Sequence, residues 1–298
     1  MTANKKFECC QVCGGELTRE LIAIRSPDRF ELHVGIEPAG YVRRWMECDR
    51  CGAAINVYSG MVKEKLQRLA AGYYEVDFKG TTIDKKYEFV MALPPERSDN
   101  AMRVARVHRF LEHWMPNDQP YCAKALDIGA GTGVFLARFV TEATRRGQRW
   151  EPNAVEPDPL AAAHLRRLGM FQVTEGLFTP GPSFEGFDLC TLNKVVEHLA
   201  DPVELLRQAG TVLSSNRGVL YVEVPAKETI DCRPTNDNIL GALHRQLYDI
   251  GSLNTALTRA GLEVIQVERI YEPSGKISIV GFAVRNELTR ILRDGGLN

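Results

Sequence analysis

The sequence predicts an α/β protein, a doubly wound sheet preceded by a small cysteine-rich β module. The first observation is the alternation, from Cys122 onward, of apolar runs of strand length with stretches of helical periodicity. The second is the crowding of five of the eight cysteines into the first 51 residues, where no long helical period occurs. The third is the length of 298 residues, which suits one large domain and a smaller appendage.

Composition narrows the class of protein. The chain is 44% hydrophobic and 25% charged, which is typical of a globular protein and excludes a disordered chain. Because 37 Lys and Arg residues nearly balance 38 Asp and Glu residues, a nucleic-acid partner is disfavoured. No apolar run reaches the roughly 18 to 20 residues that span a bilayer, and the start MTANKKFECC lacks the apolar core of a signal peptide. We therefore expect a cytoplasmic protein with no membrane partner.

Three segments follow one another along the chain. Residues 1–59 form the cysteine-rich module, with β-like runs such as YVRRWMEC and AAINVY. Residues 60–120 form a helical bridge, in which Asp99 or Asn100 can cap the helix over DNAMRVARVHRFLEHWM. Residues 121–298 form the α/β domain, whose strand-like runs are AKALDIGA, AVEP, FQVTEG, FDLCTLN, RGVLYVEVP, LEVIQVERIY and KISIVGFAVR. Since no helical stretch separates the last two runs, they should form an antiparallel hairpin at the sheet edge.

A glycine-rich turn follows the first strand of this domain. The segment ALDIGAGTGVFLARF predicts strand, turn and helix, with Gly129, Gly131 and Gly133 in the turn, where a ligand can approach the backbone closely. Glu156 ends the next strand, where a carboxylate can accept both hydroxyls of a ribose. Asp127 lies two residues before the first glycine, badly placed for a pyrophosphate and well placed for an ammonium group. The pattern therefore favours a nucleoside cofactor with an amino-acid tail.

Four ordered motifs connect these residues with a known family. LDIGAGTG, VEPD, FDLCTLNKVVEHLADP and GVLYVEVP together resemble the class I S-adenosylmethionine-dependent methyltransferases over about residues 122–285. The resemblance implies a Rossmann-like seven-stranded sheet and S-adenosylmethionine as the cofactor. It also implies contacts with the methionine part at Asp127, Gly129 and Gly131, the ribose at Glu156, the adenine near Asp158 and Phe178, and the methionine end at Asn193. The alternatives are a nicotinamide enzyme or a glycine turn without a ligand.

The first catalytic candidate is His198, in NKVVEHLADP. It lies just beyond the fourth strand, at the edge where doubly wound sheets bind ligands. Methyl transfer is an in-line displacement, so the enzyme must align the nucleophile and remove its proton, and an imidazole with a pKa of about 6.5 suits that task. Glu197 and His198 also match the EHxxDP motif of many small-molecule methyltransferases. The alternative is that the pair caps the following helix and satisfies the loop.

Two further candidates come from the resemblance. His244, in LHRQLYDIGSLNTALTRAG, matches the histidine of the EHxxxFSxxSL segment of sugar and quinone methyltransferases, where that histidine faces the substrate. Leu243 and Asp249 depart from that segment, which puts a Glu-His dyad there in doubt. Tyr74, in GYYEVDF, matches an aromatic segment that closes over the cofactor in related enzymes. Alternatively, this segment packs the bridge against the sheet.

The cysteines of the module form two CxxC pairs, which are Cys10 with Cys13 and Cys48 with Cys51. Each pair is followed by a glycine that can open a knuckle turn. Four thiolates suit tetrahedral Zn²⁺, and a closed four-cysteine site is structural rather than catalytic. A redox-active CxxC is the alternative.

The combination predicts the substrate class. A zinc module before a class I domain is found in sugar methyltransferases and in ribosomal RNA guanine methyltransferases, whose zinc site is more compact and includes a histidine. The wide cysteine interval, the neutral charge and GYYEVDF favour the first group. Sugar C-methyltransferases usually carry a further C-terminal domain, whereas this sequence ends shortly after KISIVGFAVR. We expect methylation, on oxygen or carbon, of a nucleotide-linked sugar for a surface glycan or natural product. Alternatives are RNA, another small hydroxylated metabolite, or cofactor binding without catalysis.

Overall fold

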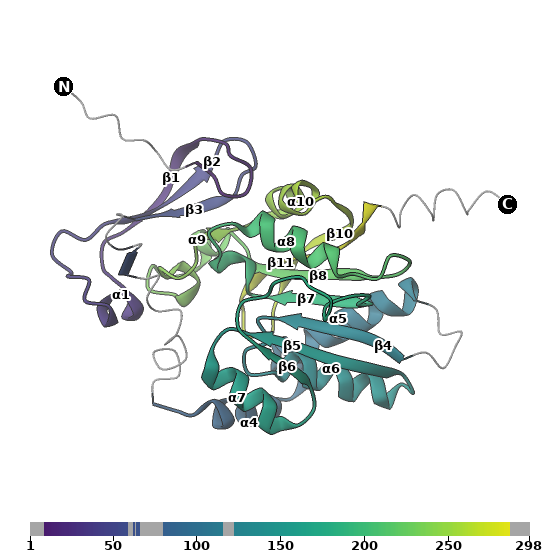
Figure 1. Cartoon of the computed structure of the whole chain (residues 1–298). Helices are drawn as coiled ribbons and strands as arrows, with labels where there is room; N and C mark the ends of the chain where they lie inside the picture. The colour runs from purple at the N-terminus through teal and green to yellow at the C-terminus, as the bar shows by residue number, and fades with distance from the viewer. Residues whose placement is uncertain (1–8, 59–61, 63, 66–79, 116–121, 287–298) are drawn as a thin grey trace.

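The main sheet of the molecule has seven strands (Figure 1). The computed structural model describes residues 9–58, 62, 64–65, 80–115 and 122–286. The strands lie in the order β10-β11-β8-β7-β4-β5-β6. Their bounds are β4 Cys122–Ile128, β5 Arg149–Glu156, β6 Gln172–Glu175, β7 Leu189–Asn193, β8 Val219–Pro225, β10 Leu262–Tyr271 and β11 Ile277–Arg285. The pairs from β8 to β6 are parallel, whereas β11 is antiparallel to both β8 and β10. The predicted Rossmann-like α/β fold with an antiparallel edge hairpin is confirmed.

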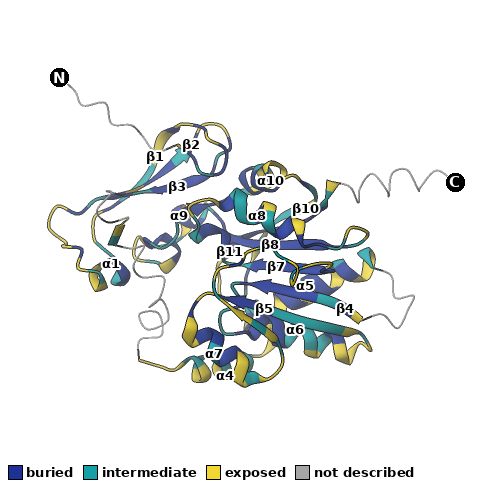
Figure 2. Ribbon diagram, in the orientation of Figure 1, coloured by how far each residue is buried: buried dark blue, intermediate teal, exposed yellow. Residues whose placement is uncertain are grey.

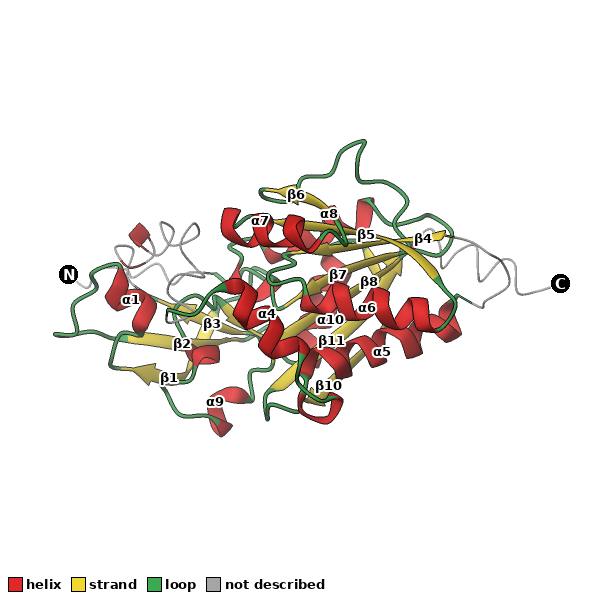
Figure 3. Cartoon of the chain, turned by 90° about the horizontal axis from the view of Figure 1, so that it is seen from below, coloured by secondary structure: helices red, strands yellow, loops and turns green. Residues whose placement is uncertain are grey.

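Helices cover both faces of this sheet (Figure 3). These helices are α5 Asp99–Trp114, α6 Val134–Arg145, α7 Pro159–Leu168, α8 Pro202–Thr211 and α10 Ile250–Arg259. In addition, α4 Ile83–Met91 packs on α6 and α7, and the short α9 Thr229–Cys232 lies against the N-terminal module. Along β8, Val219 and Tyr221 belong to a hydrophobic cluster with α5 and α6, and Leu220 and Val222 belong to a cluster with α8 and α10. This alternation is that of a strand buried on both faces, and Figure 2 shows the central strands as buried.

None of the helices in the described part of the chain is long and apolar enough to cross a bilayer.

Three helices of the domain begin at an aspartate. The Asp158 carboxylate accepts hydrogen bonds from the first backbone amides of α7, and Asp201 does the same for α8. Asp249 forms a reciprocal capping box with Ser252 at the start of α10. Because a short polar side chain at the N-cap satisfies free amides, these residues fix where each loop ends and each helix begins.

The N-terminal module is a second sheet of four strands (Figure 1). It contains β1 Leu17–Ile24, β2 Arg43–Cys48 and β3 Ala54–Val57, with the short helix α1 Arg29–His33 between β1 and β2. The fourth strand, β9 Gln246–Leu247, comes from the α/β domain and pairs antiparallel with β3. The predicted segment boundaries, at residues 59 and 120, lie outside the described residues. The module sheet is thus completed by residues far away in the sequence.

Two cations, buried Arg43 and half-buried Lys227, strengthen the contact between the module and the α/β domain. The Arg43 side chain is 1% exposed, and its Nη1 donates to the Leu240 carbonyl oxygen at 2.7 Å. Lys227 Nζ lies 2.9 Å from the Glu47 carboxylate and 2.7 Å from that of Asp249. Arg43 and Glu47 of the module therefore hold the stretch between β8 and α10 at two points, Leu240 and Lys227.

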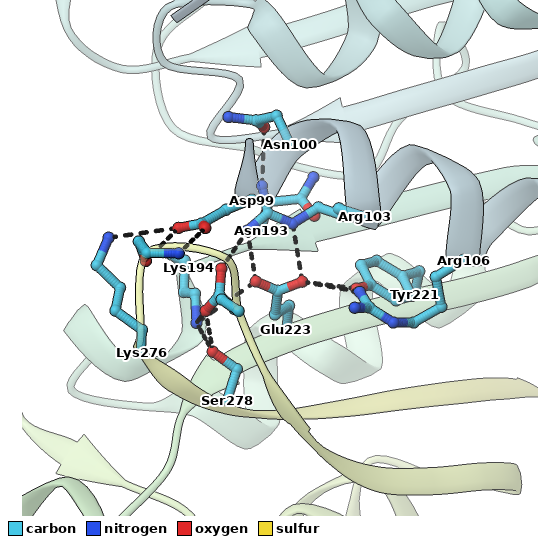
Figure 4. Close-up of polar contacts among 12 residues, drawn as sticks. Asp99, Asn100, Arg103, Arg106, Asn193, Lys194, Tyr221, Glu223, Lys276 and Ser278 are labelled. Carbon is cyan, nitrogen blue, oxygen red and sulfur yellow. Dashed lines mark hydrogen bonds and ion pairs between the residues drawn. The ribbon is translucent and has the colours of Figure 1, made fainter. Parts of the chain in front are cut away.

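A buried ion network joins α5 to the carboxyl end of β8 (Figure 4). The Glu223 carboxylate is buried and accepts a hydrogen bond from Arg103 Nε at 2.8 Å and a second from Arg103 Nη2. Lys194 Nζ lies 3.4 Å from Glu223 and 3.0 Å from Glu272. Although burial alone would raise it, the pKa of Glu223 lies well below its usual range because Arg103 and Lys194 stabilise the ionised form. The network fixes α5 and the residue after β7 against β8.

We expect Glu223→Gln to lower the free energy of unfolding by about 3 kcal/mol, because it leaves Arg103 and Lys194 with Glu272 as their remaining carboxylate in the interior. Urea unfolding followed by circular dichroism measures this loss. The control is Glu20→Gln, which breaks the half-exposed Arg44–Glu20 pair and should change the free energy by less than about 1 kcal/mol. An equal loss of unfolding free energy in the two variants would contradict the stabilising role of the buried Glu223 network.

Candidate active site

The glycine-rich turn between β4 and α6 is built so that only glycine fits. Gly129, Gly131 and Gly133 have φ values of 74°, 56° and 75°, a region that side chains disfavour. A Cβ on Gly129 would lie 2.6 Å from Val195 Cγ2, and one on Gly133 would lie 2.5 Å from Leu165 Cδ2. The turn therefore presents bare backbone at the carboxyl end of β4.

Glu156 lies beside this turn at the end of β5. One carboxylate oxygen accepts from Gly131 N at 2.7 Å, and the other accepts from Asp158 N at 2.9 Å. The side chain is buried, and burial raises its pKa while these two amides oppose the shift. Because each oxygen has a second lone pair, the fixed carboxylate suits the two hydroxyls of a ribose.

Asp127 and Asn193 form a polar pair at the carboxyl ends of β4 and β7. The Asp127 carboxylate accepts from Thr191 Oγ1 at 2.6 Å and from Asn193 Nδ2 at 2.9 Å. Burial raises the pKa of Asp127 to about 6, and these two hydrogen bonds oppose the shift. The Asn193 Oδ1 is buried and has no partner among the described residues. A buried acceptor beside a carboxylate suits a cationic group such as an amino-acid ammonium.

Asp158 and Phe178 lie farther along the same edge. Asp158 Oδ1 caps α7 by accepting from Leu160 N at 2.9 Å and Ala161 N at 3.0 Å, while its Oδ2 is buried without a partner among the described residues. Phe178 is buried, with its ring centroid 5.3 Å from that of Phe184. Their contacts with an adenine stay predictions.

The residues present fit the predicted cofactor. The glycine-rich turn joins two polar groups. The Glu156 carboxylate, bonded to Gly131 N of this turn, suits a ribose, and the Asp127–Asn193 pair just before the turn suits an ammonium. A nucleoside that carries an amino acid matches both ends of this arrangement.

The two candidate histidines, which the sequence presents separately, lie side by side. His198 ends the short 3₁₀ helix Val196–His198 after β7, and His244 precedes β9. Their ring centroids are 4.6 Å apart. His198 Nδ1 donates to the Leu243 carbonyl oxygen at 3.0 Å, and His244 Nδ1 donates to that of Ile239 at 2.7 Å, because a carbonyl can only accept. Burial lowers the pKa of both imidazoles below the usual value, which keeps them neutral near pH 7.

Glu197 lies next to the histidine pair and has an unusual environment. The residue is fully buried, and neither carboxylate oxygen has a partner among the described residues. Burial raises the pKa of Glu197 to about 8. Helix α8 is capped by Asp201, whose Oδ1 accepts from Glu204 N at 3.0 Å, so the alternative that Glu197 and His198 cap it is wrong.

Tyr74 lies outside the described residues, and its role stays a prediction.

Two residues at the site were missed by the sequence analysis. Lys194 has a φ of 59°, a strained value for a residue with a side chain, and it separates Asn193 from the 3₁₀ helix. Asn56 of β3 donates from Nδ2 to the His244 carbonyl oxygen at 2.7 Å, and its backbone N donates to that of Arg245 at 2.8 Å. A lysine carries no turn signal, and Asn56 occupies a run that shows only strand character, so neither role has a local signal.

The cysteines of the module come together as predicted. The Sγ atoms of Cys10, Cys13, Cys48 and Cys51 all lie within 4.8 Å of one another, with Cys10–Cys51 at 3.6 Å and Cys13–Cys48 at 3.4 Å. A tetrahedral Zn²⁺ with Zn–S bonds of about 2.3 Å places sulfur atoms about 3.8 Å apart. After each pair a glycine with positive φ donates back to the first cysteine, Gly14 N to Cys10 O at 2.7 Å and Gly52 N to Cys48 O at 3.0 Å. The donor set fits a structural zinc ion.

Comparison with known proteins defines the class. Residues 96–267, more than half of the chain, match the family model described as "Methyltransferase domain". The chain therefore belongs to this family, and the enzyme class predicted from the motifs, an S-adenosylmethionine-dependent methyltransferase, is confirmed. No curated protein sequence matches the chain.

Two solved structures illustrate the likeness in fold. The plantazolicin methyltransferase BpumL, solved in complex with monoazolic desmethylPZN analog and SAH, is 14% identical with a TM-score of 0.51, over 76% of this chain and 100% of that chain. The citrinin polyketide synthase CMeT domain is 18% identical with a TM-score of 0.50, over 62% of this chain. The match spans 53% of that second protein's length. At these identities the likeness concerns the fold alone.

We expect Glu156→Gln to weaken S-adenosylhomocysteine binding by about tenfold or more, because hydrogen bonds to a charged group contribute about 1.5 to 3 kcal/mol. Isothermal titration calorimetry measures the affinity. Glu175→Gln, at the exposed end of the adjacent strand β6, is the matched control and should bind like the wild type. Wild-type affinity in Glu156→Gln would contradict the ribose assignment.

We expect Asn56→Ala to speed amide hydrogen exchange in residues 238–248 by about tenfold, because it removes buried hydrogen bonds worth about 1 to 3 kcal/mol to the backbone that carries His244. Hydrogen–deuterium exchange with mass spectrometry reads this segment directly. Asn153→Ala, which removes the Asn153–Glu151 hydrogen bond in β5, should leave the segment unchanged. Unaltered exchange in Asn56→Ala would show that β3 does not hold the segment.

Proposed function

We propose that the protein transfers the methyl group of S-adenosylmethionine to a sugar, in a nucleotide-linked form, during the biosynthesis of a surface glycan or natural product. The observation that carries the proposal is the pairing of His198 and His244 at the carboxyl end of β7, next to Asn193 and the cofactor-fitting residues. Two neutral imidazoles at the ligand-binding edge of the sheet suit removal of a proton from an acceptor.

The cofactor supplies an electrophilic methyl group on a sulfonium. Asp127 and Asn193 are proposed to hold its ammonium, and Glu156 its ribose. His244 or His198 takes the proton from the acceptor hydroxyl, or from a carbon next to a ketone. The acceptor atom then forms the bond to the methyl carbon, and the S–C bond breaks with its electron pair going to sulfur.

The sugar acceptor is supported by the resemblance of this sequence to sugar methyltransferases. Their zinc module, with its wide cysteine interval, and the GYYEVDF segment with Tyr74 correspond to features of this chain. We also propose that the four cysteines bind Zn²⁺, which stabilises the two turns that carry them. The cytoplasmic location and the absence of nucleic-acid and membrane partners stay predictions.

The test is transfer of a radiolabelled methyl group from S-adenosylmethionine to a panel of nucleotide sugars, to free sugars and to RNA. We expect label on a nucleotide sugar, a loss of about a hundredfold or more in His244→Ala with S-adenosylhomocysteine affinity kept, and no change in His33→Ala, a variant of an exposed histidine of the module. Label on RNA alone would overturn the sugar acceptor, and unchanged turnover in His244→Ala would overturn its role as the base.

A further inference from the structure

Glu197, His198 and His244 form a cluster that is separate from the cysteine site. One nitrogen of each histidine and one carboxylate oxygen all lie within 4.8 Å of one another. The residues come from two segments, the 3₁₀ helix after β7 and the stretch before β9. The backbone between them is fixed, since Arg245 N donates to the Glu197 carbonyl oxygen at 2.7 Å.

The Glu197 carboxyl group is the observation that points to a ligand. It is fully buried, and both of its oxygens are without a partner among the described residues. A buried carboxylate without a bonded counter-charge is strongly disfavoured. Lys194 and Arg103 act on Glu197 only through space, because Arg103 binds Glu223 and Lys194 binds Glu223 and Glu272. A cation bound at the cluster would supply the missing charge.

The two histidines have the arrangement of metal ligands. In each, Nδ1 donates its proton to a backbone carbonyl, that of Leu243 for His198 and that of Ile239 for His244. In this tautomer Nε2 carries the lone pair with which an imidazole can bind a metal, and the carbonyl fixes the ring orientation.

We propose that Glu197, His198 and His244 bind a divalent first-row transition cation such as Mn²⁺ or Fe²⁺. Two imidazoles and one carboxylate are a known ligand set for such ions, and three protein ligands leave coordination positions open, unlike the closed four-cysteine site. Oxygen ligands from the acceptor fit the open positions, and neighbouring hydroxyl or keto oxygens of a sugar are suited to fill them.

The consequence for catalysis rests on the proposed function, whereas the binding itself does not. A cation at this site lowers the pKa of a coordinated hydroxyl, whose proton leaves to solvent before the oxygen accepts the methyl group. The proton removal assigned above to an imidazole is then achieved by the cation, and the imidazoles hold the cation in place.

Binding is tested without any acceptor. The zinc-loaded protein is titrated with MnCl₂ while free Mn²⁺ is followed by electron paramagnetic resonance. We expect one Mn²⁺ per chain, an affinity at least about tenfold weaker in Glu197→Gln and in His244→Gln, and no change in His33→Gln. Retained S-adenosylhomocysteine binding shows that a variant is folded. If Glu197→Gln fails to fold, the Mn²⁺ affinity of His244→Gln decides the test. No Mn²⁺ binding by the wild type, or wild-type affinity in the folded variants, would overturn the site.

Activity separates this proposal from the previous one. Methyl transfer to a nucleotide sugar that rises on addition of Mn²⁺ to the zinc-loaded enzyme supports the metal site and the sugar acceptor, and replaces an imidazole by the cation in the proton removal. Mn²⁺ binding without methylation of any nucleotide sugar contradicts the sugar acceptor and leaves the metal site supported. Methyl transfer at full rate without the cation contradicts its catalytic role.

Discussion

The backbone pairing of β3 with β9 is the constraint on which the active site depends. Only two residue pairs form it, Ala54 with Leu247 and Ile55 with Gln246. Asn56 extends the contact to the residues that carry His244. The segment before β9 contains one 3₁₀ turn and otherwise follows a loop path, so it has little regular structure to fix its own position. The edge of β3 therefore supports the position of His244, together with the hydrogen bonds from Arg245 N to the Glu197 carbonyl oxygen and from Gln246 Nε2 to that of Val196.

The same dependence explains why the cysteine module belongs to this enzyme. A zinc ion in a closed four-cysteine site has no open coordination position, so it contributes nothing to methyl transfer directly. By fixing the turns around β2 and β3, the zinc ion would fix the edge of β3. The strand β9 and the residues before it, which include His244, are attached to this edge. Arg43 reinforces the contact through a buried hydrogen bond to Leu240, and Lys227 through an ion pair with Glu47. The module thus acts on the reaction through geometry.

Much of the fold and of the cofactor site could be predicted because each signal is local. The glycines after β4, the acid that ends β5 and the hairpin of two successive apolar runs are encoded within a few residues. The cysteine cluster could be predicted because CxxC spacing is itself a geometric requirement of the metal. The pairing of His198 with His244 could not be predicted in this way, because it depends on a strand added from a distant segment. The strained backbone of Lys194 and the bonds of Asn56 were missed for the same reason, since their causes lie in tertiary contacts.

The mixed origin of the module sheet also bears on biosynthesis. Its first three strands leave the ribosome early, whereas β9 emerges almost two hundred residues later. During that interval the outer edge of β3 has free amide and carbonyl groups, the kind of edge that pairs with other extended chains. Nascent chains are therefore exposed to wrong strand pairing at β3, and the completed enzyme covers this edge with β9, the two-residue strand that follows His244.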